Sequence, residues 1–258
     1  MKDQPRRPYL LAEANLADVG PTDYEVAVLP WGATEAHNFH LPYATDNYQL
    51  EGIISTAAKK AWEAGAKIIV LPTIPYGVQT GQLDIKLCMN ILPATQLALL
   101  KDLCEVLIRA GICKLAILNG HGGNDFKAII RELSFHFPDL FVCCINWFGC
   151  EPKEGYFEHP DGDHADEMET SLMLHLRPHL VDMAKAGDGR AKKWKFKAMC
   201  EGWVVGQRQW TKVSADTGVG NPHQATAEKG EKYLAAVSRK IAGFLIELAA
   251  TPNGEFYE

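Results

Sequence analysis

Residues 25–64 read EVAVLPWGATEAHNFHLPYATDNYQLEGIISTAAKKAWEA. They begin with an apolar run of strand length, residues 25–30, and end with residues 47–64, whose apolar side chains recur on one helix face. The polar stretch between these runs contains four ionisable side chains: Glu35, His37, His40 and Asp46. The segment therefore predicts a strand, a loop and a helix, with candidate functional residues concentrated in the loop.

The same alternation continues along the chain. Further strands are predicted at residues 67–71, 114–118 and 141–147, and helices at residues 93–110, 125–137 and 226–249. Apolar strands that alternate with amphipathic helices indicate a mostly parallel sheet covered on both faces. We therefore expect a single three-layer α/β domain over residues 1–258. An irregular excursion at residues 184–225, rich in Gly and Trp, is expected to form a pocket wall or a subunit contact.

The composition argues against several classes of protein. The chain has 258 residues, of which 47% are hydrophobic and 22% charged, as in a soluble globular enzyme. Its net charge of -6 argues against a nucleic-acid partner. The basic segment 185–197 is interpreted as a solvated loop or edge strand. A patch for an anionic substrate or nucleic acid is the alternative, because Trp194 and Phe196 interleave with its lysines.

Targeting signals and cysteine usage indicate the compartment. The first residues lack the apolar core of a signal peptide, and no apolar run approaches the roughly 18–20 residues that span a bilayer. The seven cysteines are odd in number and form no CxxC pair, so they indicate reduced thiols rather than disulfides or a thiolate zinc site. We expect a cytoplasmic protein with no membrane partner.

Candidate ligands follow two of the predicted strands. Glu35 and His37 lie beyond strand 25–30, and His121 lies beyond strand 114–118 in the sequence NGHGGN, residues 119–124. Ligands gather at the C-terminal ends of parallel strands, so these side chains are expected on one rim of the sheet. In extended chain, residues two apart project to the same side about 6.5–7 Å apart. Carboxylates and imidazoles without cysteine suit Zn, Mn or Fe(II).

Simpler interpretations of these residues remain open. Asp46 stands directly before a helix-like run, with Gln49 three residues later, which is typical of an N-cap in a capping box. NGHGGN is a weak match to a nucleotide-binding loop, because it is neither GxGxxG nor GxxxxGK[ST]. A histidine on such a turn, beside free backbone N–H groups, suits a metal ligand next to an oxyanion site.

A third polar cluster, DGDHADEMETSLML, occupies residues 161–174. Asp161, Asp166 and Glu167 are interpreted as acidic residues that complement a helix dipole. Glu169 differs, because it lies among apolar helical residues where an unpaired charge is costly to bury. His164 and Glu169 can face one site only if His164 lies in the loop before the helix.

Four segments in this order resemble the creatininase (creatinine amidohydrolase) family. They are WGATEAHNFHLPYATD at 31–46, NGHGGN at 119–124, HADEMETSLML at 164–174 and TGVGNPHQATAEKGEKYL at 217–234. The resemblance implies a compact α/β fold and a dinuclear metal site that hydrolyses C–N bonds of amides, cyclic amides or formamides in small molecules. It also implies a homo-oligomer, usually a hexamer.

The matching motifs imply five metal ligands: Glu35, His37, Asp46, His121 and Glu169. Asp46 would bridge two divalent ions (Zn, Mn or Fe). Creatininase itself has a glutamate two residues after the NGH histidine, where this chain has Gly123; relatives with NGHGGN supply the carboxylate from the E-T-S motif, here Glu169. His164 matches the catalytic histidine, which would give a proton to the leaving nitrogen after attack by a metal-activated hydroxide. His40 is expected to be structural or to support the ligands.

The chain departs from the family pattern near the proposed ligands. Ala36, Asn38 and Phe39 replace Gln, Gly and Pro, and Asp166 replaces the glycine of H-A-G-E. Residues 75–90, PYGVQTGQLDIKLCMN, lack the family's serine-and-histidine pattern. We therefore expect a pocket reshaped around Asn38 and Phe39 and a substrate other than creatinine.

Three other functions are considered. One is a deformylase or peptide-trimming hydrolase of a cofactor pathway, which uses the same site on another bond. A second is a non-catalytic binding protein with a vestigial metal site, and a third is a nucleotide-binding module that uses NGHGGN. Substrate screening, metal analysis and nucleotide-dependent stabilisation distinguish them.

Overall fold

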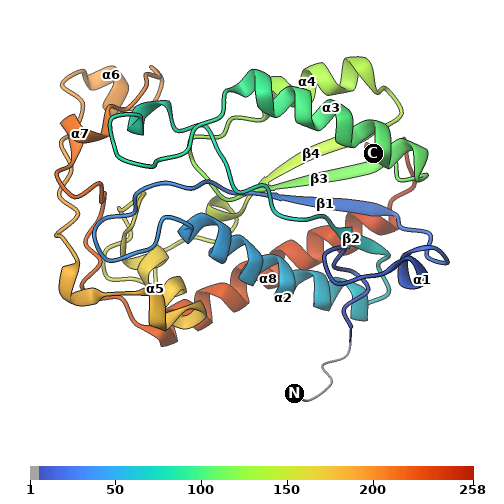
Figure 1. The fold of residues 1–258 in the computed structure, drawn as a ribbon, viewed down its shortest axis with the longest axis horizontal. Helices are drawn as coiled ribbons and strands as arrows, with labels where there is room; N and C mark the ends of the chain where they lie inside the picture. The colour runs from blue at the N-terminus through green and yellow to red at the C-terminus, as the bar shows by residue number, and fades with distance from the viewer. Residues whose placement is uncertain (1–5) are drawn as a thin grey trace.

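The central sheet has four parallel strands in the order β2-β1-β3-β4 (Figure 1). The computed structural model describes residues 6–258. Its strands are β1 (Val26–Trp31), β2 (Ile68–Val70), β3 (Lys114–Asn119) and β4 (Phe141–Asn146). Each strand lies within one residue of the bounds predicted for it at either end, and the predicted parallel α/β class is confirmed.

Helices cover both faces of the sheet. One layer contains α2 (Thr45–Glu63), α5 (Glu167–Leu176) and α8 (Ala227–Ala250), which pack on one another. The other contains α3 (Pro93–Arg109) and α4 (Lys127–His136). Figure 1 shows the two layers above and below the strands.

The two cores follow from the alternation of side chains along each strand. Val26 and Val28 of β1 pack with α2 and α8, whereas Ala27 and Leu29 pack with α3 and α4. Successive strand residues point to opposite faces, so a strand buried on both sides is apolar throughout. This explains why strand-length apolar runs predicted the elements well.

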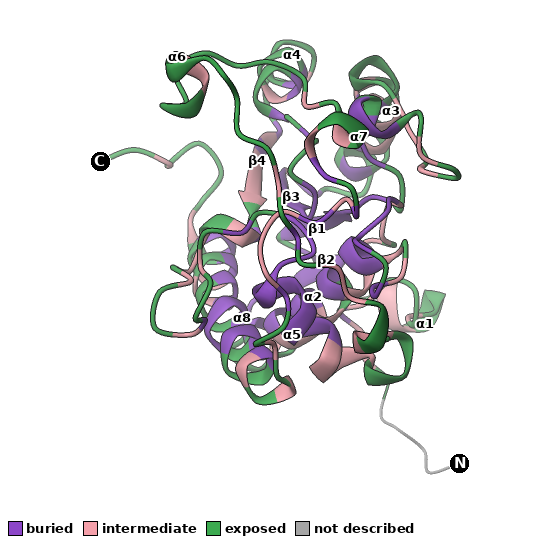
Figure 2. Cartoon of the chain, turned by 90° about the vertical axis from the view of Figure 1, so that its left-hand side faces the viewer, coloured by how far each residue is buried: buried purple, intermediate pink, exposed green. Residues whose placement is uncertain are grey.

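Short elements lie mainly in the connections. They are α1 (Leu16–Val19), η1 (Thr80–Gln82), η2 (Trp147–Gly149), η3 (Pro178–Leu180), η4 (Met183–Lys185), α6 (Lys197–Cys200) and α7 (Trp210–Val213). Three of them, η4, α6 and α7, belong to the predicted excursion, which lies beyond the C-terminal ends of the strands, at the left of Figure 1. Figure 2 looks onto this end of the molecule, where α6 is largely exposed, β1 is buried and β4 is only partly buried.

The prediction that Asp46 caps α2 is wrong. The helix begins at Thr45, its N-cap is Ala44, and no side chain makes the cap hydrogen bond. Asp46 instead lies in the first turn, where a negative charge still complements the helix dipole. The aspartate therefore belongs to the helix, and its carboxylate is free for other contacts.

Of the helices in residues 6–258, none is long and apolar enough to cross a membrane. All seven cysteines are free thiols, as the sequence predicts.

Candidate metal centre

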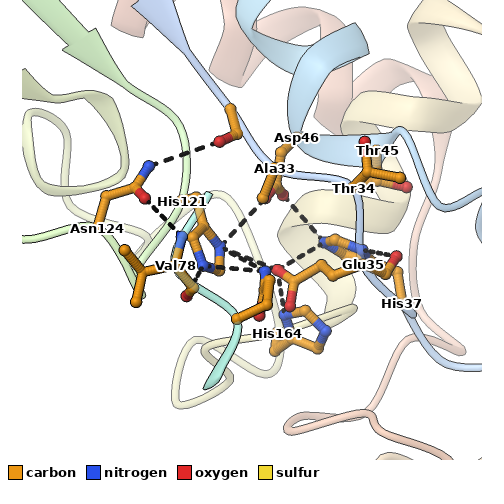
Figure 3. A network of polar contacts seen from close by, with 12 residues as sticks. Ala33, Thr34, Glu35, His37, Thr45, Asp46, Val78, His121, Asn124 and His164 are labelled. Carbon is orange, nitrogen blue, oxygen red and sulfur yellow. Dashed lines mark hydrogen bonds and ion pairs between the residues drawn. The ribbon is translucent and has the colours of Figure 1, made fainter. Parts of the chain in front are cut away.

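Six buried side chains meet at the C-terminal end of the sheet: Glu35, His37, Asp46, His121, His164 and Glu169. They come from loops that follow β1 and β3, from the start of α2, and from the segment that leads into α5 together with the first turn of α5. The loops bring together residues far apart in the sequence, because all parallel strands end at this edge. Figure 3 shows His121 and His37 on either side of Asp46.

The six residues form overlapping groups, each close enough to hold one metal ion. One group is Glu35, Asp46 and His121, and a second is His37, Asp46 and Glu169. A third joins His164 to Glu35 and His37. Asp46 is shared by the first two groups, which corresponds to the bridging position that the family resemblance implies.

The distances show how Asp46 joins the two groups. Its Oδ1 lies 3.0 Å from His37 Nε2, and its Oδ2 lies 3.3 Å from His121 Nδ1. Glu35 Oε1 lies 3.0 Å from His121 Nδ1, and Glu169 Oε2 lies 3.8 Å from His37 Nε2. Each oxygen of one carboxylate thus faces a different imidazole.

The cluster strongly shifts the pKa values of its two central histidines. Burial alone lowers the pKa of His37, but Asp46 and Glu169 outweigh it and raise that pKa to about 10. Burial acts in the same way on His121, where Glu35 and Asp46 hold the pKa well above its usual value. Both imidazoles are therefore protonated at neutral pH when carboxylates are their only charged partners.

The carboxylates respond in opposite directions. Burial raises the pKa of Glu35 and of Asp46, yet the neighbouring histidines outweigh it and lower both. Burial dominates at Glu169 and raises its pKa to about 8, despite the opposing effect of His37. Three carboxyl groups therefore share the buried cluster with two protonated histidines, and one of the three, Glu169, is neutral at pH 7.

The start of α5 positions Glu169 and His164. Asp166 is the N-cap and accepts a hydrogen bond from Glu169 N, and Glu169 Oε2 accepts one from Ala165 N at 2.6 Å. His164 lies in the loop before α5, as required for both residues to face one site. Asp166 also pairs with Lys153 at 2.7 Å. The acidic residue that replaces the family's glycine is thus a buried cap that pairs with a partly buried lysine.

His164 has a defined orientation. Its Nε2 lies 2.8 Å from Ala36 O, which accepts a hydrogen bond, so Nδ1 is the nitrogen that faces Glu35 at 3.8 Å. Burial lowers the pKa of His164, and the charged His37 adds to this effect. Trp210 lies against the His164 ring, with centroids 4.5 Å apart. A neutral imidazole therefore presents an unprotonated nitrogen to the site.

The chemistry of the cluster fits divalent metal ions. His37 Nε2 and Asp46 Oδ2 are buried, and their close contacts with Asp46 Oδ1 and His121 Nδ1 do not have hydrogen-bond geometry, so neither atom has a hydrogen-bond partner among the described residues. Such atoms are costly to bury unless something binds them. Imidazole nitrogens and carboxylate oxygens in this number suit Zn, Mn or Fe(II). The residues that meet here therefore fit the metal pair that the motifs imply.

A cavity of about 700 Å³ opens above the cluster. Glu35, Asp46, His121 and Glu169 lie at its base, together with Trp147 and Met168. Part of its wall comes from the excursion: Val205, Gly206, Gln207, Arg208 and Trp210. Residues 205–210 of the excursion thus contribute to the cavity wall, which is one of the two roles expected of it.

Neither Asn38 nor Phe39 lines the cavity, so any effect of these two residues on the pocket is indirect. Asn38 adopts a left-handed φ of 54°, which glycine and asparagine tolerate best, so it can replace the family's glycine. Its side chain accepts a hydrogen bond from Gly187 N and ties the excursion to the ligand loop. Phe39 is 62% exposed.

His40 lies outside the cluster. Its Nε2 lies 2.8 Å from Thr170 Oγ1, and burial, with the neighbouring His37, lowers its pKa to about 4. Two glutamines that the sequence did not single out approach the ligands instead. Gln79 Nε2 lies 3.0 Å from His121 Nε2, and Gln82 Nε2 donates to Glu35 Oε2. The only sequence signal for them is the departure from the family pattern in residues 75–90.

Comparisons with known proteins agree with this site. A family model for creatininase, described as creatinine amidohydrolase, matches residues 12–245. The chain is 27% identical over 235 residues to the mycofactocin precursor peptide peptidase of Mycolicibacterium smegmatis, covering 89% of this chain and 87% of the relative. It is also 27% identical over 183 residues to the creatinine amidohydrolase of Pseudomonas putida, covering 63% of this chain and 68% of the relative.

A solved structure is closer still. The crystal structure of a Bacteroides fragilis NCTC 9343 protein, provisionally described as a creatinine amidohydrolase, matches with a TM-score of 0.91 and 41% identity. The match covers 98% of this chain and 100% of that one. The buried carboxylate–imidazole cluster at the ends of the parallel strands has the ligand types of a metal-dependent hydrolase. Because the family model extends over most of its length, the chain belongs to the creatininase family and is a metal-dependent amidohydrolase.

Proposed function

We propose that the chain hydrolyses a C–N bond of a small amide, cyclic amide or formamide at a dinuclear metal centre. Glu35, Asp46 and His121 would hold one ion, and His37, Asp46 and Glu169 the other. The observation that carries this proposal is the geometry of Asp46, whose two oxygens face different histidines at 3.0 and 3.3 Å. A carboxylate in this arrangement is typical of a bridging ligand.

The metals are proposed to be Zn, Mn or Fe(II). Creatininase structures that share this fold, with TM-scores of 0.75 and 0.74 at 24% identity, are described as a Zn-Zn type and as a Mn form. When bound, a pair of divalent ions supplies a water of lowered pKa as the nucleophile and polarises the carbonyl of the substrate.

His164 is the proposed proton carrier. Its Nδ1 faces the cluster without a proton, because the other ring nitrogen is held by Ala36 O. It can therefore accept a proton from the attacking water and return it to the leaving nitrogen, which is too basic to depart as an anion. Trp210 covers part of the ring and restricts its rotation.

The glycine turn after His121 is the proposed oxyanion site. Gly122 and Gly123 line the cavity beside His121, and their backbone N–H groups would be the donors to a reacting carbonyl bound there. Such donors stabilise a tetrahedral intermediate more than the planar substrate.

A peptide is the second candidate substrate. The cavity, at about 700 Å³, lies within the range that accommodates drug-sized ligands and is large for a single small ring. Relatives that align with most of this chain are named as peptidases of a precursor peptide. A peptide-trimming reaction would use the same ligands and the same proton carrier on a different amide.

Cytoplasmic location and a homo-oligomer, with a hexamer implied by the family resemblance, are also proposed. Free thiols support the first, and exposed large apolar side chains such as Phe39, Leu83 and Trp203 support the second. Light scattering of the purified chain tests the assembly, and a monomer at micromolar concentration would contradict it.

Metal analysis combined with substrate screening tests the proposed function. We expect about two metal ions per chain and chelator-sensitive hydrolysis of one class among formamides, cyclic amides and short peptides. His164→Asn should retain the metals and lose about 100-fold or more in turnover. Undiminished hydrolysis by metal-free protein would contradict the proposal, and cleavage of peptides alone would favour the second candidate.

A further inference from the structure

Residues 75–90 form a strap that crosses the ligand loop. Met89 N donates to Thr34 O at 2.9 Å, and Thr34 Oγ1 donates to Pro75 O at 2.8 Å, so both ends of the strap are fastened beside Glu35. Within it, the single turn η1 carries Gln82. This is the stretch in which the chain departs from the family's serine-and-histidine pattern.

Gln82 makes a direct contact with a proposed ligand. Its side chain is fully buried, and its Nε2 donates a hydrogen bond to Glu35 Oε2. The other oxygen, Glu35 Oε1, is left facing His121 Nδ1 at 3.0 Å. One oxygen of the carboxylate is thus held by the protein, and one is free to bind a metal ion.

Cys88 determines which way the Gln82 amide points. Its Sγ donates to Gln82 Oε1 at 3.0 Å, which leaves the amide N–H₂ group for Glu35. Cys88 Sγ also accepts a hydrogen bond from Ala36 N at 3.3 Å. These hydrogen bonds run from the Glu35 side chain through Gln82 and Cys88 to the backbone N–H of Ala36, the residue after Glu35.

We propose that Gln82 is a positioning residue that orients Glu35 for the metal ion shared with His121, and that Cys88 sets the orientation of the Gln82 amide. The inference rests on the proposed function, because it assigns Glu35 as a ligand. It concerns only the half of the centre formed by Glu35 and His121. The half formed by Glu169 and His37 has a different support, the backbone N–H of Ala165.

The strap also connects Glu35 with the cavity wall. A Cβ on Gly81 would lie 2.1 Å from Arg208 O and 3.2 Å from Trp210 Cδ1, so η1 packs directly against the excursion. Thr211 Oγ1 donates to Asp84, two residues after the same turn. The position of Gln82 is therefore determined jointly by the ligand loop and by the wall of the cavity.

Gln82→Met tests the first part, since methionine has a similar length and no N–H donor. Metal content after dialysis and competition with a chelator give the affinity of each ion. We expect one of the two ions to bind about 10- to 100-fold more weakly, while the other is unchanged. Gln224→Met is the matched control, because Gln224 is exposed and does not line the cavity.

Cys88 variants test the second part. Cys88→Ala removes the S–H donor and should weaken the same ion about 10-fold, whereas Cys88→Ser keeps a donor and should restore the affinity. Cys113→Ala is the control, because that thiol contacts Gly111 O outside the site. If Gln82→Met does not fold, as judged by circular dichroism, the Cys88 pair decides the question.

The outcomes separate this inference from the proposed function. Two tightly bound ions in Gln82→Met and Cys88→Ala, with wild-type affinities, would overturn the positioning role and leave the proposed function intact. Equal weakening of both ions would also overturn it, since a general loss of structure would explain that result. A wild-type chain that binds no metal would overturn the proposed function and this inference together.

Discussion

The two halves of the candidate metal centre differ in origin and in charge. Glu35 and His121 come from loops at the ends of neighbouring parallel strands, whereas Glu169 comes from helix α5. The first pair lies 3.0 Å apart, and His121 lowers the pKa of Glu35. Glu169 lies 3.8 Å from His37, and its burial raises its pKa to about 8. Before a metal binds, the carboxylate that belongs only to the first half, Glu35, is therefore charged, whereas the one that belongs only to the second half, Glu169, is neutral at pH 7.

Asp46→Asn should have the largest effect, because Asp46 is the residue that the two halves share. It removes a charge that faces both His37 and His121, so both ions should be lost together. We expect a decrease in hydrolysis of about 1000-fold or more, since metal ions contribute several kcal/mol of charge stabilisation. Metal analysis and kinetics of the purified variant provide the measurement. Retention of one tightly bound ion would show that the halves are independent.

Glu35→Gln and Glu169→Gln should separate the halves. Each variant is expected to keep about one ion per chain, because the other three-residue group remains intact. Their metal-free forms should differ in stability. Glu35→Gln breaks a buried ion pair and should cost about 3 kcal/mol, whereas Glu169→Gln resembles the protonated carboxyl and should change the free energy of unfolding by less than about 0.5 kcal/mol.

Denaturant unfolding in the presence of chelator measures this difference near pH 7. Equal destabilisation by the two substitutions would contradict the assigned charge states. The Glu169 result is the more informative, because a large loss there would mean that the carboxylate is ionised in the metal-free protein.

Gly123→Ala should disturb only the half that contains His121. A Cβ at this position would lie 2.3 Å from both His121 Nε2 and Val78 O, so the imidazole has to move. Gly122→Ala is the matched control, because no atom lies within 4 Å of its added Cβ. We expect the affinity for one ion to fall about 10-fold or more in Gly123→Ala and to be unchanged in Gly122→Ala. Chelator competition on both variants measures this, and equal affinities would contradict it.

Much of the fold and the site could be predicted from the sequence, for a physical reason. Strands buried on both faces are continuously apolar, and polar residues directly beyond them lie at the sheet edge where ligands gather. Glu35, His37 and His121 followed from that rule. Asp46, Glu169 and His164 depended on the family resemblance, because helix periodicity alone does not show which face of α2 or α5 meets the strand ends.

Contacts between distant loops could not be predicted. Gln82 reaches Glu35 only because the strap at residues 75–90 folds across the ligand loop, and no periodic pattern encodes that path. Asn38 and Phe39 were expected to reshape the pocket because they depart from the family pattern beside His37. The left-handed turn at Asn38 instead directs its side chain to Gly187, in the excursion. The Asp46 cap failed because the helix begins at Thr45, two residues before the predicted start at residue 47.

The smallest expected effect is a difference in proton release when the halves are loaded with metal. A ligand must lose its proton to bind a metal ion. In the metal-free protein at pH 7, His37, with a pKa of about 10, and Glu169, with a pKa of about 8, are both protonated. In the other half only His121 is protonated, because the pKa of Glu35 is lowered.

The direction of the pH dependence follows from these raised pKa values. Protonated ligands compete with the metal at low pH, so both affinities should increase as pH rises. The increase should be steeper for the half with Glu169, at about tenfold per pH unit for each proton released. Glu169→Gln isolates the half with one proton to release, and Glu35→Gln the half with two. Titration calorimetry in two buffers of different ionisation enthalpy counts the protons released on metal binding. Equal counts in the two variants would contradict the proposed difference in charge between the halves.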